Sequence, residues 1–457
     1  MQRLTLPADS KAFARPAHPL LRFVATAIVE HRDVVLSIAT AFAIQALLIV
    51  SGVSAARILG AEGRGHLAAL VLIAAVIAQA GTLGLPLAAT YYIAREPAAR
   101  LTIGRRLLRL LLPLTAAMLA LQAAITLVVF SGDSASVQEA AFVTCAALVG
   151  LVCNTFGLAI LQGCGRFRAF NALRTVQLIL YAAGALALLL AGSHSLPQVS
   201  AAWSAATLLA GGLVLAFAWR GLRGGGDPTP TPARDMLRFG VTGLVGHASP
   251  LESYRVDQIA VGIIAGPVGL GLYVAGLAFS NLPRFVAQSI GMVAYPRLAA
   301  APSDASRQVL AFFLLTLAAS GAIVLALQAA VGELLPLLLG HEFAGAVPLA
   351  RVLLLSALLF GLRRVLSDCA RGLGRPDLGS IAEATSWLVA LPAVLVFGHL
   401  WGAQGVAWAL VLGAGASVIV LGGLMIQQMR ADKPRKRHSP SSGDASEDSA
   451  RAGVLEA

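Results

Sequence analysis

The stretch "ILGAEGRGHLAAL", Ile58 to Leu70, places three glycines between two long apolar runs of the chain. The same glycine spacing recurs in "IAGPVGLGLYVAG", Ile264 to Gly276, with Gly266 displaced by 206 residues from Gly60. A second pair of segments, "GCGRFRAF" from Gly163 and "GLGRPDLG" from Gly372, is displaced by 209 residues. Two independent matches at nearly the same displacement predict that the chain consists of two homologous halves.

The composition of the chain is that of a membrane protein. Of its 457 residues, 58% are hydrophobic and 12% are charged, and the mean hydropathy is +0.80. Soluble domains carry about 25% charged residues, and a helix needs about 20 mostly apolar residues to cross a bilayer. We therefore predict an all-α polytopic membrane protein, with about 12 transmembrane helices in two homologous six-helix halves around a central cavity. The predicted spans are residues 34–57, 66–94, 106–130, 137–162, 170–191, 196–219, 239–264, 268–295, 308–331, 345–368, 377–398 and 402–427.

Arginines gather on alternate connections between the predicted spans. The positive-inside rule places the arginine-rich side in the cytoplasm, so both termini are predicted to be cytoplasmic. Topology then accounts for the net charge of +12, and no nucleic-acid partner is expected. Six helices per half give the two halves the same orientation in the membrane. The predicted organisation is a cytoplasmic leader at 1–33, an N-terminal half at 34–219, a cytoplasmic linker at 220–238, a C-terminal half at 239–427 and a disordered cytoplasmic tail at 428–457.

The three glycines at Gly60, Gly63 and Gly65 have the spacing of a phosphate-binding loop. Such a loop follows a β-strand and precedes a helix, whereas an apolar membrane helix precedes Gly60. Glycines also permit tight turns and let two membrane helices approach closely. We therefore predict that this stretch is the tip of a helical hairpin.

Several segments resemble bacterial polysaccharide flippases, the exporters of O-antigen, capsule and exopolysaccharide. "ARILGAEGRGHLAALVLIAAVIAQAGTLGLPLAATYYIAR" resembles their first helical hairpin, and "LQGCGRFRAF" their segment between helices four and five. "YRVDQIAVGIIAGPVGLGLYVAGLAFSNLPRFVAQSIGMVAYPRLA" is similar to their seventh and eighth helices, including Asp257, Gly269-x-Gly271-x-Tyr273 and Tyr295-Pro296. These flippases belong to the multidrug/oligosaccharidyl-lipid/polysaccharide exporter superfamily. The resemblance spans nearly the whole chain.

The resemblance implies a transporter of the bacterial cell inner membrane. Its substrate would be an undecaprenyl-diphosphate-linked oligosaccharide, flipped across the membrane by alternating access for surface or exopolysaccharide biosynthesis. Its partners would be membrane lipids, a polysaccharide polymerase and a chain-length regulator. One alternative is a cation-coupled multidrug extruder of the same superfamily, whose site should favour acidic and aromatic residues. The other is a peptidoglycan lipid II flippase, a class whose members have fourteen helices instead of the twelve predicted for this chain.

No motif of the chain indicates an enzyme. The sequence contains no HExxH motif, no paired catalytic carboxylates and no Ser/His/Asp arrangement above chance spacing. The four cysteines lack the spacing of a metal site. We expect no catalytic residues, no cofactor and no metal.

Charged residues inside the predicted spans are the candidates for a binding site, because each costs about 2.5–3.5 kcal/mol at a helix centre. Arg255 is predicted to lie about 14 Å from the outer end of the seventh helix, near mid-bilayer. Glu252 should share its face and Asp257 should point elsewhere, so Arg255 either binds an anionic headgroup or pairs with Glu252 as a brace. Arg284 either lines the cavity or extends to the inner headgroups. The substrate-binding candidates are Arg255, Arg284, Arg363 and Arg364, and the coupling or ion-pair candidates are Glu252, Asp257 and His247.

Overall fold

The computed structural model describes residues 32–222, 232–247, 254–300 and 305–435, and every regular element in these ranges is helical. The apolar, helix-forming runs of the sequence become long helices that need no partner for their backbone hydrogen bonds. The elements are α2 (Arg32–Gly81), α3 (Leu85–Arg95), η1 (Pro97–Ala99), α4 (Arg100–Val129), α5 (Ala135–Gly163), α6 (Phe167–Leu173), α7 (Val176–Leu190), α8 (Leu196–Gly221), α9 (Ala233–His247), α10 (Val256–Ala300), α11 (Ala305–Leu339), η3 (His341–Ala346), α12 (Val347–Gly372) and α13 (Pro376–Arg435).

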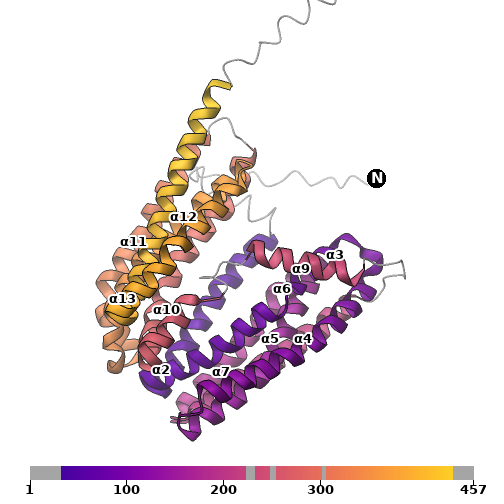
Figure 1. The fold of residues 1–457 in the computed structure, drawn as a ribbon, viewed down its shortest axis with the longest axis vertical. Helices are drawn as coiled ribbons and strands as arrows, with labels where there is room; N and C mark the ends of the chain where they lie inside the picture. The colour runs from indigo at the N-terminus through magenta and orange to yellow at the C-terminus, as the bar shows by residue number, and fades with distance from the viewer. Residues whose placement is uncertain (1–31, 223–231, 248–253, 301–304, 436–457) are drawn as a thin grey trace, which may run out of the picture.

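The helices form two bundles (Figure 1). The first bundle contains α2 to α9, and the second contains α10 to α13. The two bundles meet through α2 and α10 at one end of the molecule, which we call the closed end. They diverge toward the other end, the open end, where α3, α9 and the last turns of α12 and α13 lie (Figure 1). Two bundles that touch at one end can rock against each other about that contact.

The closed end is formed by the two glycine stretches that the sequence repeats. Gly60 and Gly266 have nearly identical left-handed conformations, with φ 65° and ψ −174° at Gly60 and φ 65° and ψ −170° at Gly266. A methyl group on Gly65 would overlap the backbone carbonyl of Pro267, and one on Gly271 would overlap that of Ala61. These two contacts are related by the sequence repeat. They confirm that the glycines form hairpin tips and permit close helix approach.

The second pair of repeated segments is also equivalent in the structure. Gly165 and Gly374 follow the ends of α5 and α12 with φ 71° and 75°. After each glycine the next backbone N–H donates to a carbonyl five residues back, from Arg166 to Leu161 and from Arg375 to Ala370, at 2.9 Å in both cases. Each helix therefore ends in the same glycine-dependent Schellman motif.

Nine helices in the described ranges are long and apolar enough to cross a membrane. The predicted count of twelve is not confirmed, because α13 contains two predicted spans and α2 and α10 each contain one span and part of another. In each of these three helices the two spans are joined at one non-helical glycine, Gly60, Gly266 or Gly402. The nine helices show that the chain is a multi-pass membrane protein.

Two predicted spans are interrupted, contrary to the continuous helices expected from their hydropathy. The span 66–94 breaks between α2 and α3, where Leu83 and Gly84 have φ 50° and 68°. The span 239–264 is divided into α9 and the first turns of α10, and Arg255, at φ 48°, precedes α10 instead of lying inside a helix. The apolar run continues through the first break, so hydropathy does not reveal it, whereas the second break falls in a polar stretch that includes Arg255 and Asp257. The tail predicted to be disordered from 428 is helical as far as Arg435.

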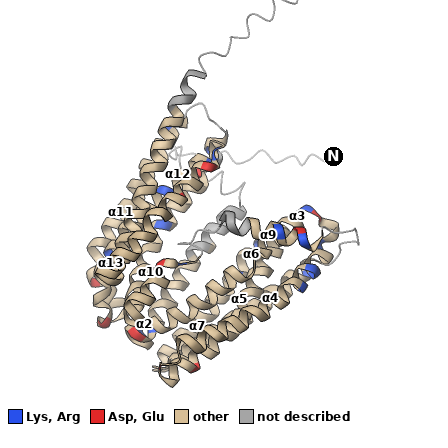
Figure 2. Cartoon of the chain, in the orientation of Figure 1, with Lys and Arg blue, Asp and Glu red and all other residues tan. Residues whose placement is uncertain are grey.

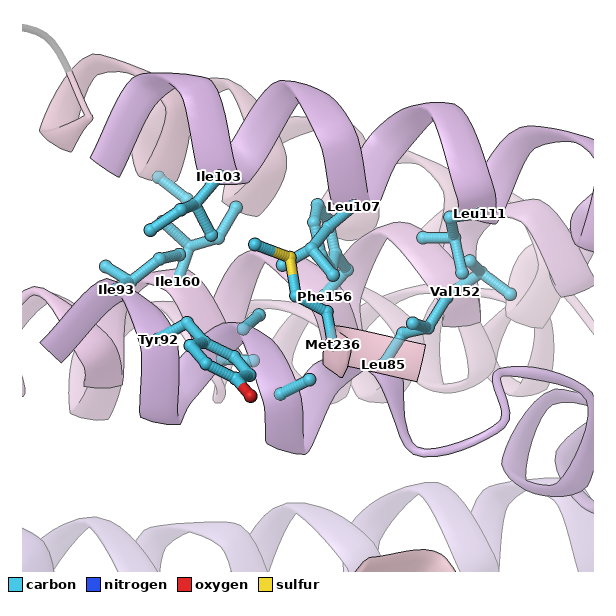
Figure 3. Close-up of a cluster of buried hydrophobic side chains, with 14 of the residues drawn as sticks. Leu85, Tyr92, Ile93, Ile103, Leu107, Leu111, Val152, Phe156, Ile160 and Met236 are labelled. Atoms are coloured by element: carbon cyan, nitrogen blue, oxygen red, sulfur yellow. The ribbon is translucent and has the colours of Figure 1, made fainter. Parts of the chain in front are cut away.

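The core of the first bundle includes a residue from the segment predicted to be the linker, 220–238. Met236 of α9 is buried with Tyr92 of α3, Leu107 of α4 and Phe156 of α5 (Figure 3). Phe239 of α9 also stacks on Tyr91 and packs edge-on against Tyr92. The chain therefore completes the first bundle with α9 before it enters the second bundle at Arg255.

Candidate functional site

A polar cavity of about 400 Å³ lies between α10, α12, α13 and α2. Three arginines and one carboxylate line it, Arg255, Arg284, Arg364 and Asp257. We call it the arginine cavity. Most residues of the long helices in both bundles are uncharged (Figure 2). The side-chain amides that line the arginine cavity are those of Gln45, Gln258, Asn281 and Gln288.

The fold-back of α10 brings Arg255 and Asp257 to the cavity. Gly266 reverses the helix, so that Asp257 lies opposite Tyr273, whose hydroxyl donates a hydrogen bond of 2.8 Å to Oδ2 of Asp257. Asp257 and Tyr273 are both buried, whereas Arg255 is exposed. The prediction that Asp257 points away from Arg255 is wrong, because Arg255 precedes the helix and both side chains line the same cavity.

Arg255 and Arg284 retain hydrogen-bonding capacity toward the cavity. Asp257 interacts electrostatically with both arginines, but among the described residues no carboxylate lies within 4 Å of either guanidinium. Arg284 places its guanidinium 5.0 Å from the ring centre of Phe360, and its buried Nε has no hydrogen-bond partner in the described part of the chain. Of the two positions considered for Arg284, the structure shows the one at the cavity wall.

Arg363 and Arg364 are neighbours in sequence but have different surroundings. Successive residues of a helix point about 100° apart. Arg363 is buried and forms an ion pair with Glu383 of α13, and Glu383 also accepts a hydrogen bond from Trp387 at 3.3 Å. Arg364 lines the cavity, with its Nε 3.5 Å from Oδ2 of Asp368. Arg363 thus connects α12 to α13, and Arg364 faces the site.

The structure does not describe the side chains of two predicted site residues, Glu252 and His247. Glu252 lies outside the described residues, so its predicted pairing with Arg255 stays a prediction. His247 is the last residue of α9. The structure therefore brings together Arg255, Asp257, Arg284 and Arg364 from the predicted set.

Sequence reasoning missed the amides that line the cavity, such as Gln45 on α2 and Asn281 on α10. A signal for them was present, because an amide within an apolar membrane helix is costly unless it has a polar neighbour or a wet cavity. Neither amide has a hydrogen-bond partner among the described residues. No group of three or more His, Cys, Asp or Glu residues in the described ranges is placed to hold a metal ion.

Comparison with known proteins shows the family of the chain. The family model described as "Polysaccharide biosynthesis protein" matches residues 31–301, more than half of the chain. No curated protein matches the chain by sequence.

Solved transporter structures share the fold. An inward-facing multidrug resistance MATE family transporter of the MOP superfamily is 18% identical, with a TM-score of 0.66 over 86% of this chain and 96% of that one. The lipid II flippase MurJ in an inward closed conformation is 12% identical, with a TM-score of 0.68 over 85% and 86%. An outward-facing MATE family transporter is 16% identical, with a TM-score of 0.59 over 88% and 96%. The chain belongs to the polysaccharide biosynthesis protein family and has the fold of MOP superfamily transporters.

Proposed function

We propose that the protein flips an undecaprenyl-diphosphate-linked oligosaccharide across the bacterial inner membrane. The observation that carries this proposal is the arginine cavity, in which three arginines face a single carboxylate. A diphosphate needs cationic hydrogen-bond donors, and the guanidinium group binds phosphate oxygens in a bidentate manner. The effect is strong in a site surrounded by apolar helices, where the dielectric constant is low.

The same cavity argues against a multidrug extruder. A cationic drug would meet three positive side chains, and like charges in a low-dielectric site repel strongly. Family membership favours a lipid-linked oligosaccharide over peptidoglycan lipid II, because the matching family model is that of polysaccharide biosynthesis. Membrane lipids, a polysaccharide polymerase and a chain-length regulator are the partners that follow from this function.

Alternating access would proceed by rocking of the two bundles about the closed end. We assign the open end to the cytoplasm, because the arginine-rich connections after Gly165 and Gly374 should face that side. The higher TM-score against the inward-facing than against the outward-facing MATE transporter, 0.66 against 0.59, supports this orientation. Asp257 is the coupling candidate that the cavity contains.

Substitution of Arg255 tests the proposal in cells that depend on this protein for glycan export. Arg255→Ala should lower export by at least about tenfold at normal membrane abundance, the scale of one charge-assisted hydrogen bond. Arg255→Lys should retain part of the activity, because lysine keeps the charge and loses the bidentate geometry. Arg105→Ala is the matched control, because Arg105 is exposed on α4 and lines none of the cavities described here.

A double variant separates binding from bracing. If Arg255 served only to pair with Glu252, then Glu252→Gln combined with Arg255→Gln would restore export. Full export by this double variant would contradict the assignment of Arg255 to the substrate site.

A further inference from the structure

A second cavity, of about 260 Å³, lies between α2, α10 and α11 on the closed-end side of the arginine cavity. Its wall is almost entirely apolar, and we call it the apolar cavity. Among the described residues, Arg64 is the one charged side chain that lines it, one turn beyond the hairpin tip at Gly60. The apolar side chains include Leu48, Ile49, Val53, Ala278, Leu282 and Leu334.

Arg64 has no counter-charge in the described part of the chain. The Tyr181 side chain of α7 lies near it, and no carboxylate among the described residues lies within 4 Å of its guanidinium group. Arg64 is half-buried beside an apolar wall, and a guanidinium group in such surroundings favours an anionic partner.

The two cavities share part of their walls. Gln45 of α2 and Asn281 of α10 line both the arginine cavity and the apolar cavity. The two cavities therefore adjoin each other at these two amides. This continuity favours the transported lipid over a bulk phospholipid as the occupant of the apolar cavity.

The dimensions of the apolar cavity suit a lipid of one leaflet. Along α2 it extends from Gln45 to Ala56, which is about 16 Å at the rise of an α-helix. That length is about half of the 30 Å hydrocarbon core of a bilayer. A lipid with its phosphate at Arg64 and its chain along this wall has the orientation of a lipid in the leaflet at the closed end.

We propose that Arg64 and the apolar cavity form a second station for the phosphate of the lipid-linked substrate, from which the flipped lipid leaves into the leaflet at the closed end. The inference rests on the proposed function and adds a site to it. The phosphate binds first among Arg255, Arg284 and Arg364, and Arg64 receives it after the bundles rock. The isoprenoid chain then lies against the apolar wall of α2, α10 and α11.

Photo-cross-linking of the full-length protein in zwitterionic nanodiscs tests this inference. The probe is radiolabelled undecaprenyl diphosphate, and p-benzoylphenylalanine replaces either Val53, in the apolar cavity, or Gln288, in the arginine cavity. We expect label at both positions. Arg64→Gln should reduce label at position 53 by at least about tenfold and leave position 288 unchanged. Arg64→Lys should retain label at 53, and the exposed Arg105→Gln should change neither.

The possible outcomes separate the two proposals. Two results would overturn the second station and leave the flippase proposal standing, provided that position 288 is labelled. In one, position 53 is not labelled; in the other, the label at position 53 does not change in Arg64→Gln. Absence of label at positions 53 and 288 in the protein with Arg64 intact would overturn both proposals. Excess unlabelled undecaprenyl diphosphate should reduce the label at position 53 more than excess undecaprenol or phosphatidylglycerol does. If the three competitors were equally effective, the apolar cavity would be a site for hydrocarbon chains or bulk lipid, and the inference would be overturned.

Discussion

At the scale of single residues, the four predicted arginines do not form one set. Arg363 is buried beside Glu383, whereas Arg364, the next residue, faces the arginine cavity. Arg255 gains its position from a left-handed backbone conformation, which costs about 1–2 kcal/mol for a residue other than glycine. Strain of this kind persists where the surrounding structure imposes it, often at a functional site.

The difference between Arg363 and Arg364 predicts different effects of substitution. Arg363→Ala removes the buried partner of the ion pair with Glu383 and should destabilise the protein by about 3 kcal/mol, because Glu383 stays half-buried and loses that pairing. Arg364→Ala should lower stability less, because Asp368 keeps its ion pair with Arg371, and it should lower glycan export. The measurement is the thermal unfolding midpoint of the purified protein, together with export in cells. An equal fall of the midpoint in both variants would contradict this division of roles.

At the scale of elements, the fold depends on helical hairpins whose tips are glycines. The closed end has no room for a side chain at Gly65 or Gly271, because the facing backbone of Pro267 or Ala61 occupies that space. Arg57 of α2 further joins the bundles there, donating hydrogen bonds of 2.7 Å to the carbonyls of Leu337 and Leu338 on α11. Close backbone contact and these two hydrogen bonds therefore hold the bundles together at the closed end.

Enlarging a tip glycine should keep the bundles apart. Gly271→Val is expected to reduce glycan export at least about tenfold, because overlap with the Ala61 carbonyl prevents the closed end from forming without backbone shifts. Gly422→Val on α13 is the matched control, since a side chain there would meet no atom within 4 Å. Normal export by Gly271→Val at normal membrane abundance would show that the close contact is not required.

At the scale of the whole molecule, the two bundles and the charge pattern together define a direction across the membrane. The arginine-rich connections follow α5 and α12 at their glycine-terminated ends, whereas η3 with Glu342 lies beside the hairpin tip at Gly60. The open and closed ends should therefore face opposite sides of the membrane, with the open end in the cytoplasm.

Single-cysteine labelling tests this direction in a background that lacks the four native cysteines. A cysteine in place of Glu342 should react with a membrane-impermeant maleimide added outside intact spheroplasts, because we assign the closed end to the outer side of the membrane. A cysteine in place of Ser303 should react only after the membrane is opened. Labelling at 303 from outside would overturn both the predicted spans and the orientation of the two bundles.

The sequence by itself determined the membrane class, the two halves and the glycine hairpin tips. These features are local or repetitive, because composition sets hydropathy and a repeated glycine spacing marks a repeated turn. Only the tertiary structure decided which charges share a cavity. Arg255 and Asp257 meet Arg284 because α10 folds back at Gly266, and α12 adds Arg364 while turning Arg363 toward α13. Contacts between residues so far apart in the chain depend on how the helices cross and pack, which no local pattern encodes.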